Sequence, residues 1–138
     1  MKYAKKKNGA AVVREVGKID IEKYRCVCDT IVTDEVVITD ERMEHIQKHH
    51  PNDYERFSEY LSQIIRDPDY IIQDTRPNTA MVLKEIVEPG ARFRLALRLV
   101  TPRDNPNYKN SIITFMKIRE KEWHRLIKNK TVLYKNES

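Results

Sequence analysis

Residues 92–100, Arg-Phe-Arg-Leu-Ala-Leu-Arg-Leu-Val, alternate between apolar and mostly cationic side chains over most of their length. This period of two predicts a β-strand with one buried face, because successive side chains of a strand point to opposite sides of a sheet. The predicted buried face consists of Phe93, Leu95, Leu97 and Leu99, and the opposite face carries Arg92, Arg94, Ala96 and Arg98. The chain must therefore contain a sheet that needs a covering layer on at least its apolar face.

Three further segments near this strand have the composition of strands. They cover residues 69–74, 80–87 and 111–118. The turn signals between the four segments are Arg76-Pro77-Asn78, Glu88-Pro89-Gly90 and the polar residues 101–110. Short connections of this kind favour neighbouring antiparallel strands, so we expect a four-stranded antiparallel sheet.

Two helices are expected before this sheet. Thr39 is a suitable N-cap, acidic residues follow it, and Pro51 disfavours helical backbone at His50, which predicts a first helix over 39–50. Asn52, with Glu55 three positions later, predicts the start of a second helix that ends near Asp67. The apolar stripe of the second helix consists of Tyr54, Phe57, Leu61, Ile64 and Ile65.

The two ends of the chain complete the expected fold. Residues 18–29 and 36–39 are predicted to form a β-hairpin, residues 119–128 a short helix, and residues 131–134 an edge strand. The fold class is therefore α+β, with an N-terminal β-hairpin and two helices followed by a four-stranded antiparallel sheet and a short C-terminal helix. We expect residues 1–17 to form a basic, flexible tail and residues 18–138 to form one domain.

Composition limits the classes of function. With 34% charged residues and no long apolar run, the chain is expected to be a cytoplasmic protein without membrane association. Only three glycines are present, which disfavours a glycine-rich phosphate loop, and we expect no cofactor. Residues 34–69 contain ten acids against four bases, whereas residues 70–138 contain fourteen bases against seven acids. This division predicts an anionic partner on the basic side, unless the charges are dispersed over the surface.

Three of the four histidines, His45, His49 and His50, fall within six residues of the first predicted helix. Three interpretations are open. They are ordinary surface residues, or His45 and His49 share a metal ion through their i, i+4 spacing, or the cluster performs metal-free acid–base chemistry. The histidine pKa of about 6.5 lies near working pH and suits the third interpretation.

The arginine face of residues 92–100 also has two interpretations. Arg94 and Arg98 present planar forks of donors that suit phosphate, or they pair with nearby acids on a solvated face. The polar segment 101–110, which includes Lys109, is long for a hairpin connection and is either a substrate-contacting loop or a passive excursion.

The order of several short motifs resembles a known family. These motifs are Val36-Val37-Ile38-Thr39, His45-Ile46-Gln47-Lys48-His49-His50-Pro51, Asp67-Pro68-Asp69, Leu83-Lys84-Glu85-Ile86 and Ser111-Ile112-Ile113-Thr114. Together they resemble the phage-associated branch of the barnase–EndoU–colicin–RelE-like nucleases, over about residues 18–134. The resemblance implies metal-independent cleavage of RNA by a phage, toxin or conflict-system effector, with RNA as substrate and a protein inhibitor or immunity protein as partner.

Matched residue by residue, the resemblance implies catalytic roles for His45, His50, Lys84 and Thr114. His49 stands where that branch more usually has arginine, so it is expected to contact substrate, together with Arg94, Arg98 and Lys109. No metal site is expected. The alternative function is a nucleic-acid-binding, structural or regulatory phage module that keeps the fold without the chemistry.

Overall fold

The computed structural model describes residues 5–8 and 11–137. The described strands are β1 (Lys5–Asn8), β2 (Ala11–Lys18), β3 (Glu35–Thr39), β4 (Tyr70–Gln73), β5 (Thr79–Ile86), β6 (Ala91–Arg98), β7 (Asn110–Ile118) and β8 (Val132–Lys135). The helices are α1 (Ile21–Tyr24), α2 (Asp40–His49), α3 (Asp53–Phe57), the 3-10 turn η1 (Ser58–Tyr60), α4 (Leu61–Arg66) and α5 (Glu120–Asn129). Among the described residues, no helix is long and apolar enough to span a membrane.

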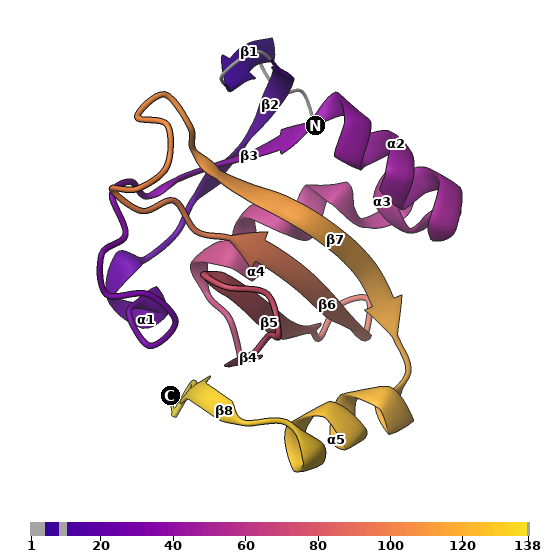
Figure 1. Ribbon diagram of the computed structural model, residues 1–138. Coiled ribbons are helices and arrows are strands. Elements are labelled where there is room, and N and C mark those ends of the chain that lie inside the picture. The colour runs from indigo at the N-terminus through magenta and orange to yellow at the C-terminus, as the bar shows by residue number, and fades with distance from the viewer. Residues whose placement is uncertain (1–4, 9–10, 138) are drawn as a thin grey trace.

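The strands form one sheet in the order β1-β2-β3-β7-β6-β5-β4-β8 (Figure 1). The predicted α+β class is confirmed, and the four predicted strands are present as the antiparallel series β7-β6-β5-β4. The prediction of a four-stranded antiparallel sheet is wrong, because this series is the middle of a larger mixed sheet. β3 joins β7 in parallel, and β8 pairs with the outer edge of β4. Both pairings join segments that are distant in sequence, which a local pattern does not specify.

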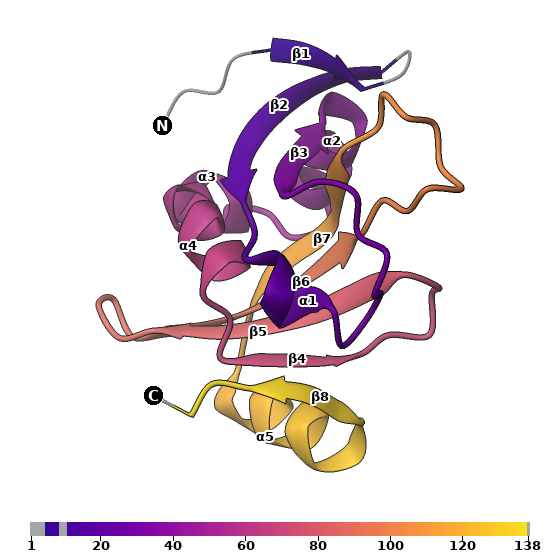
Figure 2. The same cartoon turned by 90° about the vertical axis from the view of Figure 1, so that its left-hand side faces the viewer.

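The main core lies between the sheet and the helices α3 and α4 (Figure 2). Phe93, Leu95 and Leu97 are fully buried there, as the alternating pattern predicts. They share this core with the predicted helical stripe, which includes Phe57, Leu61, Ile64 and Ile65. The opposite face of the sheet has its own smaller core, in which α5 contributes Trp123 and Leu126. The sheet is therefore covered on both faces, but the α5 face only in part.

The second predicted helix is broken into α3, η1 and α4. Asn52 is the N-cap residue of α3, as predicted, but it adopts a left-handed conformation, with φ of 72°, and its side chain makes no capping hydrogen bond. The carboxylate of Asp53 instead accepts a hydrogen bond from the backbone N–H of Lys117 in β7, at 3.0 Å. This contact fastens the first turn of α3 to the sheet. The chain then bends at Phe57, whose φ and ψ are −124° and 2°.

The predicted strand over residues 18–29 is also wrong. Asp20 accepts a hydrogen bond from the N–H of Glu22 and starts the short helix α1. Tyr24 at the end of α1 is fully buried, and its hydroxyl donates to the carbonyl of Ile65. The antiparallel partner of β3 is β2, which lies before the predicted strand.

The predicted domain boundary at residue 18 lies at the end of β2. Val13 and Val16 of this strand are buried, so residues 11–17 belong to the folded domain and not to a flexible tail. The part of the predicted tail over residues 1–4 and 9–10 lies outside the described residues.

Candidate active site

The helix α2 lies along one edge of β7. β3 pairs with β7 only at Val36–Asn110 and Val37–Ser111, and the chain leaves the sheet after Thr39. The remainder of β7 thus has no strand partner on this side among the described residues, and α2 and α3 pack against it. This arrangement places the side chains of α2 at the boundary between the two faces of the sheet.

The predicted bounds of the first helix are confirmed within one residue. The hydroxyl of Thr39 accepts a hydrogen bond from the N–H of Arg42 at 3.1 Å, and acidic residues occupy the first turn. The helix ends at His49, and the N–H of His50 donates to the carbonyl of Ile46 at 2.8 Å. Ile46 is buried in the main core and holds the helix against the sheet.

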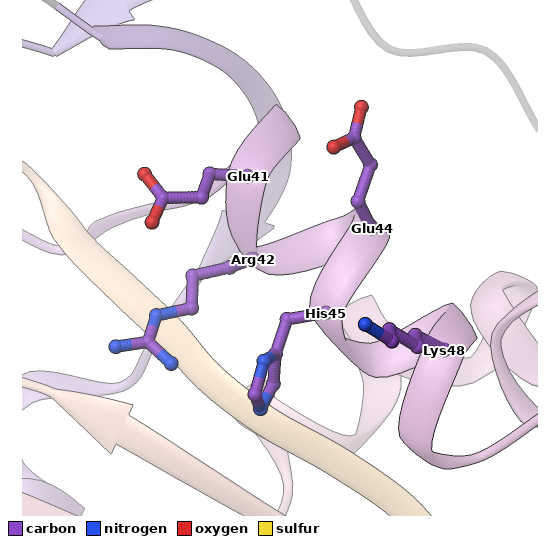
Figure 3. Close-up of a pocket in the computed structure, with 5 residues that line it drawn as sticks. All are labelled: Glu41, Arg42, Glu44, His45 and Lys48. Atoms are coloured by element: carbon purple, nitrogen blue, oxygen red, sulfur yellow. The ribbon is translucent and has the colours of Figure 1, made fainter.

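The histidines of α2 face outward. His45 and His49 are exposed, and their ring centroids lie 4.3 Å apart. Figure 3 shows His45 projecting from α2 on the same side as Arg42. These two residues line an open cavity of about 310 Å³, together with Glu41, Glu44 and Lys48. One imidazole and two cationic side chains therefore line the same cavity.

The surroundings of His45 favour the neutral form of its imidazole. Loss of hydration lowers the pKa of His45 below its ordinary value, and the positive charges of His49 and Arg42 lower it further. A neutral imidazole can accept a proton, so His45 has the protonation state that a general base needs near neutral pH.

Lys84, the predicted strand cation, lies elsewhere. Its side chain is buried on the main-core face, where its strand position pairs with that of Phe93. The ammonium lies 3.3 Å from a carboxylate oxygen of Asp67 and 3.3 Å from one of Asp69. Asp67 also accepts a hydrogen bond from Lys23 at 3.2 Å. Lys84 is thus part of an ionic cluster below α4.

Thr114 lies on the other face of the sheet from Lys84. Thr114 pairs with Ala96, which pairs with Met81 of the α5-side core. Residues paired directly across strands point to the same side, so Thr114 and Lys84 point to opposite faces. Thr114 follows a bulge at Ile113 in β7, the strand whose edge α2 covers. The structure therefore places Thr114 on β7, the strand that α2 and α3 contact, and Lys84 on the opposite face of the sheet.

The four residues expected to contact substrate also lie in separate parts of the structure. His49 lies beside His45, whereas Arg94 and Arg98 pair with Glu122 at 3.5 Å and Asp104 at 3.0 Å. Lys109 pairs with Glu35 at 2.7 Å. The contacts of Arg94 and Arg98 therefore agree with the second interpretation of the arginine face, in which these arginines pair with nearby acids.

Sequence reasoning missed Arg42 and Lys48 as candidate site residues. Each lies three positions from His45, and this spacing places side chains on one face of a helix. The helical period could have identified them once the helix was assigned. Within the described residues, no three histidine, cysteine, aspartate or glutamate side chains are grouped so that they could hold a metal ion.

These features define an α+β protein in which one surface helix carries an exposed imidazole, two cationic side chains and two acidic side chains around one cavity. A family model described as phage-Barnase-EndoU-ColicinE5/D-RelE like nuclease2 matches residues 11–135. The chain therefore belongs to this nuclease family, and the resemblance found in the sequence is confirmed. No curated protein and no solved structure matches the chain.

Proposed function

We propose that the protein is a metal-independent endoribonuclease whose active site is built on α2. The observation that carries this proposal is the position of His45, an exposed imidazole with a lowered pKa, beside Arg42 and Lys48 at one cavity. Membership of a nuclease family supports the same chemistry.

In the proposed reaction, neutral His45 takes the proton of a ribose 2′-hydroxyl. The 2′-oxygen then attacks the adjacent phosphorus, and the bond from phosphorus to the 5′-oxygen breaks. A protonated histidine donates a proton to this leaving oxygen, which leaves a 2′,3′-cyclic phosphate and a free 5′-hydroxyl. Arg42 and Lys48 supply positive charge for the phosphate oxygens as negative charge develops on them.

We assign the acid role to His50. The rings of His45 and His49 are only 4.3 Å apart, which leaves no room for a phosphate group between them. His49 is therefore assigned to substrate contact on the same side as His45. His50 follows the last turn of α2 and is half-buried, which would hold its ring in place.

The other predicted residues receive different roles in this proposal. Thr114 is assigned a hydrogen bond to substrate, because it lies on the strand beside α2. Lys84 is assigned to the ionic cluster, because two carboxylates already surround its buried ammonium.

The decisive experiment incubates purified protein with RNA and with DNA of the same sequence, with and without a chelator. Wild type should cleave RNA in both conditions and leave DNA intact, because DNA lacks the 2′-hydroxyl nucleophile. His45→Ala should lower the rate by about a hundredfold or more, as expected for removal of a general base. His124→Ala is the matched control, since this exposed histidine lies on α5 and pairs with Glu120 at 3.5 Å.

Chelator-sensitive cleavage, or cleavage of DNA at a comparable rate, would contradict the mechanism. RNA binding without cleavage would favour the non-catalytic module. If His124→Ala and His45→Ala lost activity equally, the assignment of the site to α2 would be wrong.

We further propose that the protein acts as a phage- or mobile-element-associated toxin or effector with a protein inhibitor as partner. The word phage in the family description supports this context. Induced expression of wild type should arrest cell growth, whereas His45→Ala at the same protein level should not. Equal growth arrest by the two proteins would separate any toxicity from nuclease activity.

A further inference from the structure

A second polar cavity lies on the opposite side of the sheet from α3 and α4. It has a volume of about 290 Å³ and is lined by residues at or next to the strands β4, β5 and β6 and the helix α5. Figures 1 and 2 show where these elements lie in the fold. Its charged lining residues are Asp74, Arg76, Arg94, Arg125 and Lys130. Four cations and one carboxylate thus line the cavity, which lies within the basic part of the chain, residues 70–138.

One wall is a fixed arginine–aspartate pair. Nε of Arg76 donates to one carboxylate oxygen of Asp74 at 2.9 Å, and a terminal nitrogen donates to the other at 2.8 Å. The side chain of Asp74 is only 3% exposed, whereas that of Arg76 is 43% exposed. The buried acid therefore orients the guanidinium, while the remaining N–H groups of Arg76 are left for another acceptor.

The opposite wall repeats this arrangement. Arg125 donates to both carboxylate oxygens of Glu122, at 2.9 and 2.7 Å, and Arg94 approaches the same carboxylate at 3.5 Å. One acid thus holds two guanidiniums at the cavity. Lys130, at the end of α5, is exposed and has no ion pair within the described part of the chain.

We propose that this cavity is a phosphate-binding subsite for RNA that extends from the α2 site. The proposal rests on the proposed function of α2. The volume of the cavity is close to the lower end of the range of about 300–1,000 Å³ for ligand cavities. A cavity of this size suits a phosphate group better than a large cofactor. Preoriented guanidiniums suit the tetrahedral oxygens of phosphate, and three of the four cations, Arg76, Arg125 and Lys130, lie outside the alternating strand pattern.

The register of the sheet connects the two sites. Thr114, on the strand that α2 contacts, pairs with Ala96, and Ala96 pairs with Met81, which lines the cavity. Two strand spacings, about 10 Å in total, separate the backbones of Thr114 and Met81. A single-stranded RNA of a few nucleotides could therefore contact both sites across one face of the sheet.

The test measures binding of a fluorescent, fully 2′-O-methylated oligoribonucleotide by anisotropy at several salt concentrations. Arg125→Gln combined with Lys130→Gln should weaken binding several-fold. The slope of log affinity against log salt concentration should also become less steep in the double variant, by about 0.7 for each phosphate that the protein no longer neutralises. Lys128→Gln is the control for a charge elsewhere on α5, because it removes one positive charge from an exposed residue that does not line the cavity.

This oligonucleotide has no free 2′-hydroxyl and cannot be cleaved, so the result does not depend on whether α2 is catalytic. An equal loss with Lys128→Gln, or an unchanged salt slope in the double variant, would overturn the subsite. Binding of millimolar inorganic phosphate to wild type but not to the double variant, without any effect of the double variant on oligonucleotide binding, would assign the cavity to a free anion instead and overturn the RNA subsite. Melting temperatures of all variants identify any loss caused by unfolding.

Discussion

At the scale of the residue, His45 shows how a surface side chain acquires a particular protonation state. It makes no ion pair that would favour its charged form among the described residues, and its neighbours include Arg42 and His49. Reduced hydration and this positive surrounding both favour the neutral ring. His124 differs in this respect, because its charged neighbour is the acidic side chain of Glu120.

The lowered pKa of His45 predicts the acid limb of the pH–rate profile. A base must be neutral, so kcat/KM should fall only below the ordinary histidine value of about 6.5. His49→Gln removes one of the positive charges that lower the pKa, so the acid limb should move upward toward that value. Initial rates on a short RNA between pH 4.5 and 8 measure the shift. An acid limb that stays in place in His49→Gln would show that His45 is not the titrating base.

Lys84 provides a second prediction at this scale, because its contacts suggest a structural role. Burial alone would raise the pKa of Asp67, but hydrogen bonds from Lys23 and Lys84 and their positive charges lower it below its ordinary value. Lys84→Met leaves the carboxylates of Asp67 and Asp69 without this partner and should lower the unfolding free energy by about 1–3 kcal/mol. Denaturant unfolding at pH 7 measures this loss.

The pH dependence of stability follows from the same lowered pKa. The contribution of ionised Asp67 is present above its unfolded pKa of about 3.9 and is lost as pH falls through the lower folded value. The difference in unfolding free energy between wild type and Lys84→Met should therefore become smaller below about pH 4. If Lys84→Met instead kept its stability and lost cleavage as strongly as His45→Ala, the catalytic role that the family resemblance implies would be correct.

At the scale of the element, the contact between β2 and α4 depends on the absence of a side chain. A Cβ atom at Gly17 would lie 2.9 Å from the hydroxyl oxygen of Ser62 and 3.4 Å from its Cβ. Gly17 also lies at the irregular register between β2 and β3. The close approach brings α4 onto the strand that adjoins β3 and thereby supports the start of α2.

Gly17→Ala should therefore destabilise the protein by about 1–3 kcal/mol, the usual cost of overpacking. Ser62→Ala removes the oxygen that the new methyl group meets, so Gly17→Ala with Ser62→Ala should recover part of the loss. Thermal and urea unfolding of the two single variants and the double variant form a double-mutant cycle. Strictly additive effects would mean that the Gly17 contact is not the source of the strain.

At the scale of the whole molecule, the sheet joins segments from both ends of the chain. β2 and β3 extend it beyond β7, and β8 extends it beyond β4. The helix α2 is held where the N-terminal strands meet β7. The candidate active site therefore depends on β2, a strand that the sequence pattern did not assign, and on the parallel pairing of β3 with β7.

A truncation tests this dependence. A chain that starts at residue 11 retains β2 and should unfold cooperatively, whereas a chain that starts at residue 19 lacks it. The shorter chain should lose cooperativity or melt at a much lower temperature, because it lacks the buried side chains of Val13 and Val16. Calorimetry of both chains makes the comparison. Equal melting temperatures would show that β2 is dispensable and that residues 11–17 are the tail that composition suggests.

The sequence by itself determined the elements whose cause is local. The alternation around Leu95 specified a strand and its buried face, and the Thr39 cap specified the start of α2, because period and capping act within a few residues. It also determined that His45 and His49 share one helix face. The family resemblance needed only the order of short motifs along the chain.

Only the tertiary structure decided which of these residues meet. The sequence could not predict that β3 would join β7 in parallel, or that Asp53 would bond to the backbone of Lys117, since such contacts depend on the assembled sheet. The same assembly turned Lys84 toward Asp67 and Thr114 toward the opposite face. Side-chain direction follows from strand register, and here register is set by pairings across the whole chain. The helix that carries the candidate histidines could therefore be predicted, whereas the surroundings of Lys84 and Thr114 on the sheet could not.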